Sequence, residues 1–145
     1  MSQAKETAAR FVAAFNAHNE SGLRALNAHD IKFEAPGGVR LTGREAATDY
    51  AMVWLNGFSN ARMTIRHEIV SGPWVIQEFT LQGTHTAPLK GPNGPIAPTG
   101  KKLVFKGVQI GRYDNGQVVD VRLYYDQVDV LTQLGQMPAP IASLA

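Results

Sequence analysis

The spacing of apolar residues changes partway along the chain, and this change restricts the fold more than any other feature of the sequence. Before Asn60, apolar residues recur at steps of three and four, which is the period of an amphipathic helix. After Asn60 they alternate with polar residues, as in a strand with one buried face. Helices followed by consecutive hairpin-forming strands indicate an α+β fold, in which helices cover one face of an antiparallel sheet.

The first part of the chain predicts helices joined by a short strand pair. The helices are expected at residues 3–19, 20–28 and 43–58. Brief strands are expected at 31–35 and 39–42, on either side of the turn Pro36-Gly37-Gly38.

The second part predicts long strands and a last short helix. The strands are expected at 63–71, 74–86, 103–113 and 117–125, and the helix at 127–134. Gly72-Pro73 and Asp114-Asn115-Gly116 are turn signals, so neighbouring strands should be antiparallel. Residues 88–100 are rich in proline and glycine, which predicts an exposed loop and a candidate lid. Glycines inside the long strands indicate a bent sheet, which would enclose a pocket when helices close it.

Composition narrows the possible chemistry. A chain of 145 residues is the size of one domain, so a single domain over 1–145 is expected. Without cysteine, thiol chemistry is excluded, and four scattered histidines predict neither a metal site nor a cofactor. A net charge of +2 predicts no nucleic-acid partner. The polar start, and the lack of any apolar run of about 18 residues, predict no signal peptide, no membrane segment and a cytoplasmic location.

Three stretches of the sequence are similar to a known family. They are GPWVIQEFTLQGTH, GRYDNGQVVDVRLYYDQ and the later VLTQLG. In their order along nearly the whole chain, they resemble the SnoaL-like polyketide cyclase family of the nuclear-transport-factor-2-like superfamily. The resemblance implies a conical, strongly curved antiparallel sheet with three N-terminal helices around an apolar pocket. It also implies a homodimer or homotetramer, and cofactor-free aldol ring closure on a small apolar molecule.

Two positions depart from the family pattern. The resemblance places the family's acid/base carboxylate at Leu123 and an assisting histidine at Gln109. Leucine carries no exchangeable proton and an amide stays neutral, so neither can act as the family residue does. The resemblance also places Phe15 and Tyr50 on the pocket wall. Other aromatic residues could also line the pocket, or could instead fill a core. The full set expected at the substrate pocket is Phe15, Phe33, Tyr50, Trp54, Trp74, Phe105, Gln109, Leu123 and Tyr125.

Two titratable residues in apolar strands are the first catalytic candidates. His67 shares a strand face with apolar neighbours, where partial loss of hydration would keep the imidazole neutral and able to accept a proton. The alternative is a core histidine that bonds to a backbone carbonyl. Glu34 lies between Phe33 and Ala35, and burial would raise its pKa into a useful range. Its alternative is a salt bridge with Arg40 or Arg44.

Two further candidates lie at strand ends. His85 precedes the proline-rich loop and either faces the pocket mouth or fixes the loop by hydrogen bonds. Asp126 follows the last strand and is the tempting replacement for the missing acid. Strand alternation places Asp126 on the face opposite Leu123, and a helix N-cap explains its presence without chemistry.

Two principal hypotheses for function follow. The first is a cofactor-independent enzyme of the cyclase, isomerase or dehydratase type, with His67 as base, Glu34 as second acid or base, and Gln109 or Tyr50 bonding the developing oxyanion. The second is a ligand-binding or scaffold domain that kept the pocket and lost the chemistry, which the residues at 109 and 123 favour. An interaction module that pairs through the exposed sheet face is a third class.

Overall fold

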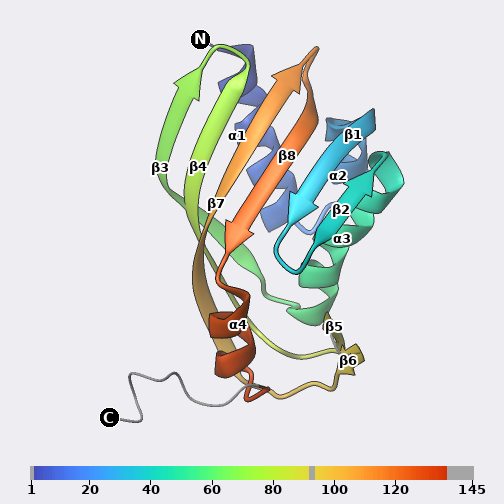
Figure 1. The fold of residues 1–145 in the computed structure, drawn as a ribbon, viewed down its shortest axis with the longest axis vertical. Coiled ribbons are helices and arrows are strands. Elements are labelled where there is room, and N and C mark those ends of the chain that lie inside the picture. Colours follow the sequence, from blue (N-terminus) through green and yellow to red (C-terminus); the bar gives the residue numbers. More distant parts are fainter. Residues whose placement is uncertain (1, 92–93, 137–145) are drawn as a thin grey trace.

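A computed structural model describes residues 2–91 and 94–136, and it has the α+β architecture that the change in period predicts (Figure 1). Its helices are α1 Gln3–Asn16, α2 Glu20–Leu26, α3 Arg44–Gly57 and α4 Gln127–Gln133. Its main strands are β1 Asn27–Ala35, β2 Val39–Thr42, β3 Arg62–Ser71, β4 Trp74–Thr84, β7 Lys102–Asp114 and β8 Gln117–Tyr125. None of the helices in this part of the chain combines the length and hydrophobicity needed to cross a membrane.

The six main strands form one curved sheet, in the order β2-β1-β8-β7-β4-β3. The consecutive pairs β1–β2, β3–β4 and β7–β8 are antiparallel, as their turn signals predict, and β4 is also antiparallel to β7. By contrast, β1 runs parallel to β8, so the sheet is mixed. Because more than half of the chain separates β1 from β8, no tight turn dictates their relative direction.

Side-chain caps start three of the helices. Ser2 accepts a hydrogen bond from the Lys5 amide at 3.3 Å, and Asn19 accepts one from the Gly22 amide at 3.0 Å. Helix α1 ends at Asn16, earlier than predicted, because His18 adopts a left-handed φ of 54°. The freed Asn16 side chain then bonds both backbone groups of Met63, which holds the end of α1 against β3.

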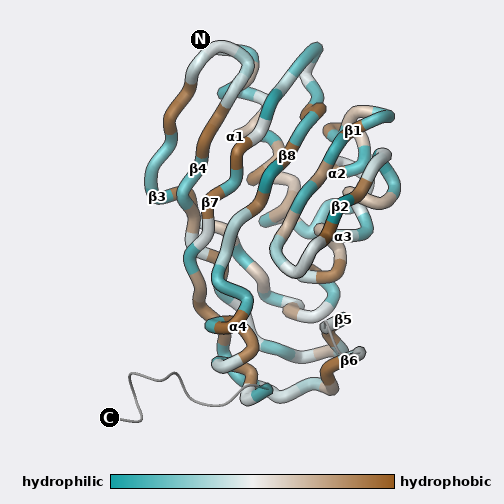
Figure 2. The backbone as a smooth tube through the Cα atoms, viewed as in Figure 1, coloured by the Kyte–Doolittle hydropathy of each residue, from teal (hydrophilic) through white to brown (hydrophobic). Residues whose placement is uncertain are grey.

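Helices α1 and α3 lie over the concave face of the sheet, and the core fills the space between them (Figure 1). Brown apolar segments alternate with teal polar ones along the strands in Figure 2, as expected for a sheet with one buried face. The largest buried side chains of this layer are aromatic, namely Phe15, Trp54, Phe58, Phe79 and Phe105. Strand alternation and helix periodicity therefore direct most of the aromatic residues to one place.

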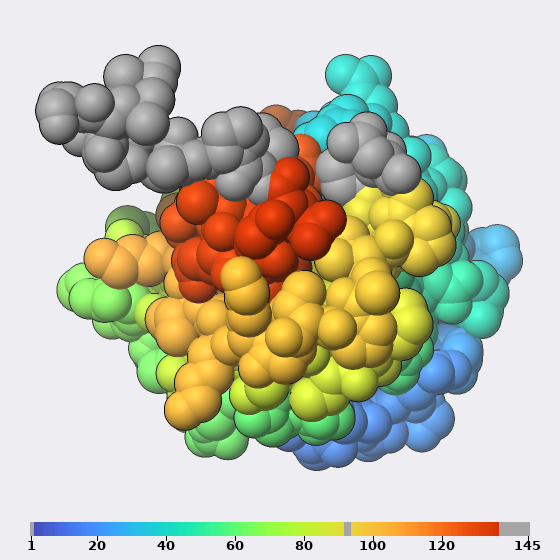
Figure 3. Space-filling view, turned by 90° about the horizontal axis from the view of Figure 1, so that it is seen from below, coloured from blue at the N-terminus to red at the C-terminus, as the bar shows by residue number. Residues whose placement is uncertain are grey.

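The loop expected at 88–100 is partly wrong, because it contains a small two-stranded ribbon. Strand β5 Leu89–Gly91 pairs with β6 Gly94–Ile96. The ribbon forms because Leu89 and Ile96 face each other and are both buried in the core, with Leu89 against Gly57 of α3. Seen from below in Figure 3, this ribbon (yellow) and α4 (red) cover one end of the molecule.

Candidate functional site

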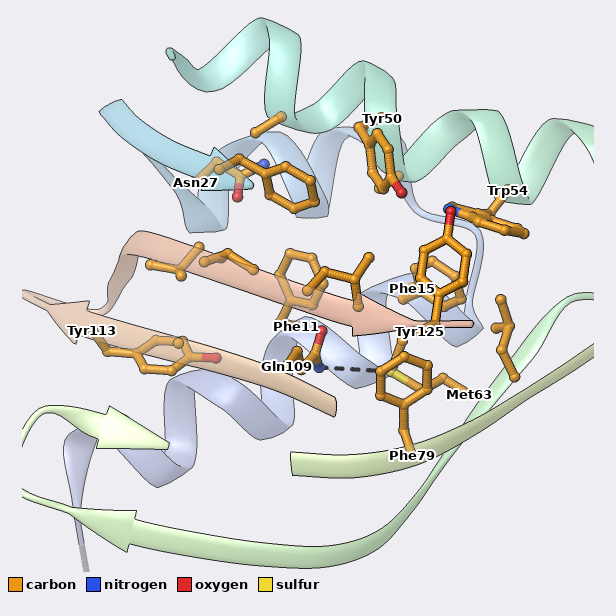
Figure 4. Close-up of a pocket in the computed structure, with 18 of the residues that line it drawn as sticks. Phe11, Phe15, Asn27, Tyr50, Trp54, Met63, Phe79, Gln109, Tyr113 and Tyr125 are labelled. Atoms are coloured by element: carbon orange, nitrogen blue, oxygen red, sulfur yellow. Dashed lines mark hydrogen bonds between the residues drawn. The ribbon is translucent and has the colours of Figure 1, made fainter. Parts of the chain in front are cut away.

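An inner hollow lies between the concave face of the sheet and helices α1 and α3 (Figure 4). Its free volume is about 60 Å³ and its wall is mainly aromatic and aliphatic. Eight residues expected in the pocket line it: Phe15, Phe33, Tyr50, Trp54, Phe105, Gln109, Leu123 and Tyr125. They come from α1, α3 and three strands, so only the folded sheet brings them together.

The expectation for Trp74 is wrong. Along β4 the buried residues are those at odd positions from Val75 to Leu81, so Trp74 belongs to the opposite face. The Arg112 guanidinium lies 6.0 Å from the centroid of the Trp74 ring, on the paired strand β7. Trp74 therefore covers the outer side of the sheet near a hairpin end, away from the hollow.

An outer groove of about 450 Å³ adjoins the inner hollow. The two spaces share Tyr50, Trp54 and Tyr125 in their walls, and the groove extends to the β5–β6 ribbon and α4. Among the described residues, the charged side chains in its wall are Asp49 and Lys90. The aromatic residues common to both walls form the boundary between the groove and the hollow.

The polar atoms of this boundary point toward one another. In Figure 4 the hydroxyl groups of Tyr50 and Tyr125 converge near the indole nitrogen of Trp54. Burial raises the pKa of both phenols; for Tyr50, hydrogen bonding with Tyr125 and Trp54 opposes that rise. Burial likewise raises the pKa of Tyr113, at the other end of the hollow. At neutral pH these phenols stay protonated and can donate hydrogen bonds.

His67 does not lie where the alternation of apolar residues predicted. Its side chain is 77% exposed, with Nε2 3.8 Å from a carboxylate oxygen of Glu78. The register of β3 against β4 shifts between Ile65 and His67, which is a β-bulge. One extra residue reverses the faces of all later positions, so His67 turns outward. The prediction of a partly desolvated imidazole on the apolar face is therefore wrong.

Glu68 takes the inward place that His67 loses, and sequence analysis missed it. The Glu68 carboxylate accepts a hydrogen bond of 2.8 Å from the buried Gln77 side chain. Glu68 stands outside the wall of the inner hollow, but Gln77 connects it to Gln109, which is part of the wall. No feature of the sequence marks the bulge, because strand alternation in the sequence continues through it.

The remaining acidic candidates lie away from both spaces. The Glu34 side chain is 51% exposed, and its Oε1 lies 3.9 Å from Arg40 Nε across the β1–β2 pair. The predicted burial of Glu34 is wrong and its salt-bridge alternative is confirmed, because the inward position on β1 belongs to its neighbour Phe33. Asp126 is exposed and accepts a 3.0 Å hydrogen bond from the Asp129 amide, so the helix-cap interpretation is confirmed.

His85 is fully buried and fixes the loop that follows it. Its Nδ1 accepts a hydrogen bond of 3.1 Å from the Thr99 amide, and its own backbone bonds to Gly100 and Lys101. The ring packs against Phe58, with 5.3 Å between centroids. Of the two interpretations of His85, loop attachment is confirmed, and the side chain lines neither the hollow nor the groove.

Stability should depend on pH through His85. Burial lowers the pKa of its imidazole, so the unfolded chain binds this proton first, near pH 6.5. The contribution of the neutral His85 side chain to the free energy of unfolding is complete above pH 6.5. It is lost as the pH falls toward the folded-state pKa, by up to about 1.4 kcal/mol per pH unit. Urea unfolding at pH 7, 6 and 5 should show this loss in the wild type and in Thr99→Ser. In His85→Gln the loss of unfolding free energy should be smaller. If the unfolding free energy changed equally with pH in all three proteins, His85 would not be the cause.

Few groups at the site can exchange a proton. Within residues 2–91 and 94–136, the side chains that line the inner hollow include no carboxylate, imidazole or amine. In the same ranges, no group of three or more His, Asp or Glu side chains is arranged to hold a metal ion. The hollow can therefore bind apolar surface and form neutral hydrogen bonds.

Sequence comparison identifies the family of this chain. The model of the SnoaL-like polyketide cyclase family matches residues 5–134. The chain belongs to this family. Among curated proteins, none matches it.

Solved structures of similar fold carry different enzyme names. A proposed SnoaL-like polyketide cyclase from Jannaschia sp. CCS1 is 22% identical, over 94% of each chain, with a TM-score of 0.81. IdmH, a proposed polyketide cyclase from Streptomyces antibioticus, is 25% identical over 92% of this chain and 99% of IdmH, with a TM-score of 0.76. An LEH-like epoxide hydrolase from M. tuberculosis is 18% identical over 92% and 90%, with a TM-score of 0.68. Such likenesses do not determine the reaction of this SnoaL-like protein.

The two departures from the SnoaL-like pattern meet inside the hollow. Gln109 on β7 and Leu123 on β8 are direct partners across the sheet, and both line the wall. The resemblance implies the family's acid/base residues at these positions. In this SnoaL-like protein the pair is an amide beside a leucine, so the wall holds neither a carboxylate nor an imidazole there.

Proposed function

We propose that this protein binds a small, mainly apolar molecule in the inner hollow, without acid/base residues of the SnoaL-like type. The observation that carries this proposal is the wall itself, where aromatic and aliphatic side chains surround a few neutral polar groups. Ligand sites in proteins have this composition. The acid/base enzyme hypothesis placed its base on His67 and its second acid on Glu34, and both side chains lie outside the hollow.

The volumes suggest how such a ligand is held. The groove, at about 450 Å³, falls within the range of about 300–1,000 Å³ that is usual for ligand sites. The hollow, at about 60 Å³, accommodates one end of a molecule. The ligand therefore enters through the groove, stacks against the aromatic boundary of Tyr50, Trp54 and Tyr125, and places one end in the hollow.

Filling the hollow should abolish this binding. Ala51 on α3 is buried and lines the hollow, whereas Ala9 on α1 is exposed and lines neither the hollow nor the groove. With 2-naphthol as the probe, Ala51→Phe should weaken binding by at least about tenfold, because the added ring occupies the site. Ala9→Phe is the matched control and should stay within about twofold of the wild type.

The measurement is a fluorescence titration of 2-naphthol, with circular dichroism to establish that each variant is folded. Equal affinity of the wild type and a folded Ala51→Phe would place the ligand elsewhere and overturn the proposal. No detectable binding to the wild type would do the same for this class of ligand.

A further inference from the structure

We propose that Glu68, acting through Gln77 and Gln109, fixes an accepting oxygen toward the hollow, so that the bound molecule must present a hydroxyl or N–H group there. This inference rests on the proposed function and specifies its ligand class. Glu68 touches no ligand in this arrangement and is a positioning residue.

The three side chains form one row across the sheet. Glu68 on β3 is the direct partner of Gln77 on β4, and Gln77 is the direct partner of Gln109 on β7. Because direct partners project to the same face, the three polar ends meet in sequence. The bulge between Ile65 and His67 makes this possible, because without it Glu68 would point outward.

The donors and acceptors that each group carries decide the direction of the row, meaning which end of each amide faces Glu68 and which faces the hollow. An ionised carboxylate only accepts, so the bond of 2.8 Å between Gln77 and Glu68 must use the Gln77 amide nitrogen. The Gln77 oxygen is left on the other side, where it accepts from the Gln109 nitrogen at 2.8 Å. Gln77 is 1% exposed. If its amide were turned round, the hydrogen bond to the Glu68 carboxylate would be lost at a buried place, where water cannot replace it.

Gln109 is the end of the row that faces the hollow. Its nitrogen is occupied by Gln77 and also lies 3.8 Å from the Met63 sulfur. In Figure 4 the Gln109 oxygen points away from Met63, among the residues that line the pocket. The polar group that Gln109 offers to a ligand is therefore an acceptor. Its partner must donate, as an alcohol, phenol, enol or N–H group does.

Asn27 supports the same pattern from the opposite wall. Its amide nitrogen donates to the Thr48 hydroxyl at 3.0 Å, and that hydroxyl donates to the Arg44 carbonyl at 2.8 Å. The Asn27 nitrogen is thereby committed toward α3, and its oxygen lies on the side of the hollow (Figure 4). Two amides from different elements thus turn acceptors inward, while the phenols of Tyr50 and Tyr125 supply donors at the boundary.

Two probes of equal shape test the inference. A hydroxyl and a methyl group are similar in size, so 2-naphthol and 2-methylnaphthalene differ mainly in the donor. We expect the preference of the wild type for 2-naphthol to fall about two- to tenfold in Gln109→Leu, which removes the acceptor. Glu68→Lys should lower the preference as well, because a lysine donates and reverses the row. Glu78→Lys is the matched control, a charge reversal of a half-exposed carboxylate on β4 that lines neither the hollow nor the groove, and should keep the wild-type preference.

An unchanged preference in Gln109→Leu and in Glu68→Lys would overturn the inference and leave the proposed function standing. If the wild type binds neither probe, the proposed function fails. The direction of the row can then still be measured in the wild-type protein without a ligand. There, nuclear Overhauser contacts between the Gln109 amide protons and the Met63 methyl group support the inference. Their absence, with both resonances assigned, overturns it whether or not the variants fold.

Discussion

Gly107→Val is expected to lower the free energy of unfolding by about 3 kcal/mol, because the position has no room for a side chain. A Cβ at residue 107 would lie 2.5 Å from the Phe79 ring and 2.9 Å from the Tyr124 carbonyl oxygen. Phe79 is 2% exposed and lines the hollow, so its ring cannot move aside without disturbing the core. Urea unfolding followed by circular dichroism measures the change.

The neighbouring residue on the same strand supplies the control. Lys106 is exposed, so Lys106→Val should change stability by no more than about 0.5 kcal/mol. A double-mutant cycle identifies the obstacle, because Phe79→Leu should reduce the cost of Gly107→Ala if the ring is what the new methyl group meets. Strict additivity of the two changes would show that the Phe79 ring is not responsible.

Most of the fold follows from local patterns in the sequence. The helices and long strands are located to within a few residues, because apolar period and turn residues act over short distances. The parallel pairing of β1 with β8 is different, since it joins segments that no turn connects. The β5–β6 ribbon was not predicted, because its prolines and glycines locally favour a loop. Burial of Leu89 and Ile96 stabilises the strand pair instead.

The candidate site was harder to predict than the fold. Most of the aromatic wall was predicted correctly, since helix and strand periodicity decide which aromatic residues face inward. Among the catalytic candidates, His67 depended on the register of β3 against β4, and the bulge after Ile65 changed it. His67 turned outward and Glu68 turned inward, so the carboxylate that bonds to the buried Gln77 comes from a residue that strict alternation assigns to the surface.

Leu123→Asp should cost about 3 kcal/mol of unfolding free energy at pH 7 and clearly less at pH 4. Leu123 packs against the core and lines the hollow, so a carboxyl group there loses hydration and its pKa should rise above the usual value of about 3.9. The folded state then holds the proton longer than the unfolded chain. Relative stability is therefore highest below pH 4 and falls as the pH rises toward the folded-state pKa.

Leu123→Asn is the matched control, because its side chain has the same size and does not ionise. The difference in unfolding free energy between the two variants should grow between pH 4 and pH 7, by about 1.4 kcal/mol for each unit of pKa shift. A constant difference would mean that the hollow leaves a carboxyl group fully hydrated. A growing difference would mean that the surroundings still shift the pKa of an acid at this position, so that the departure from the family pattern at residue 123 lies in the side chain and not in its environment.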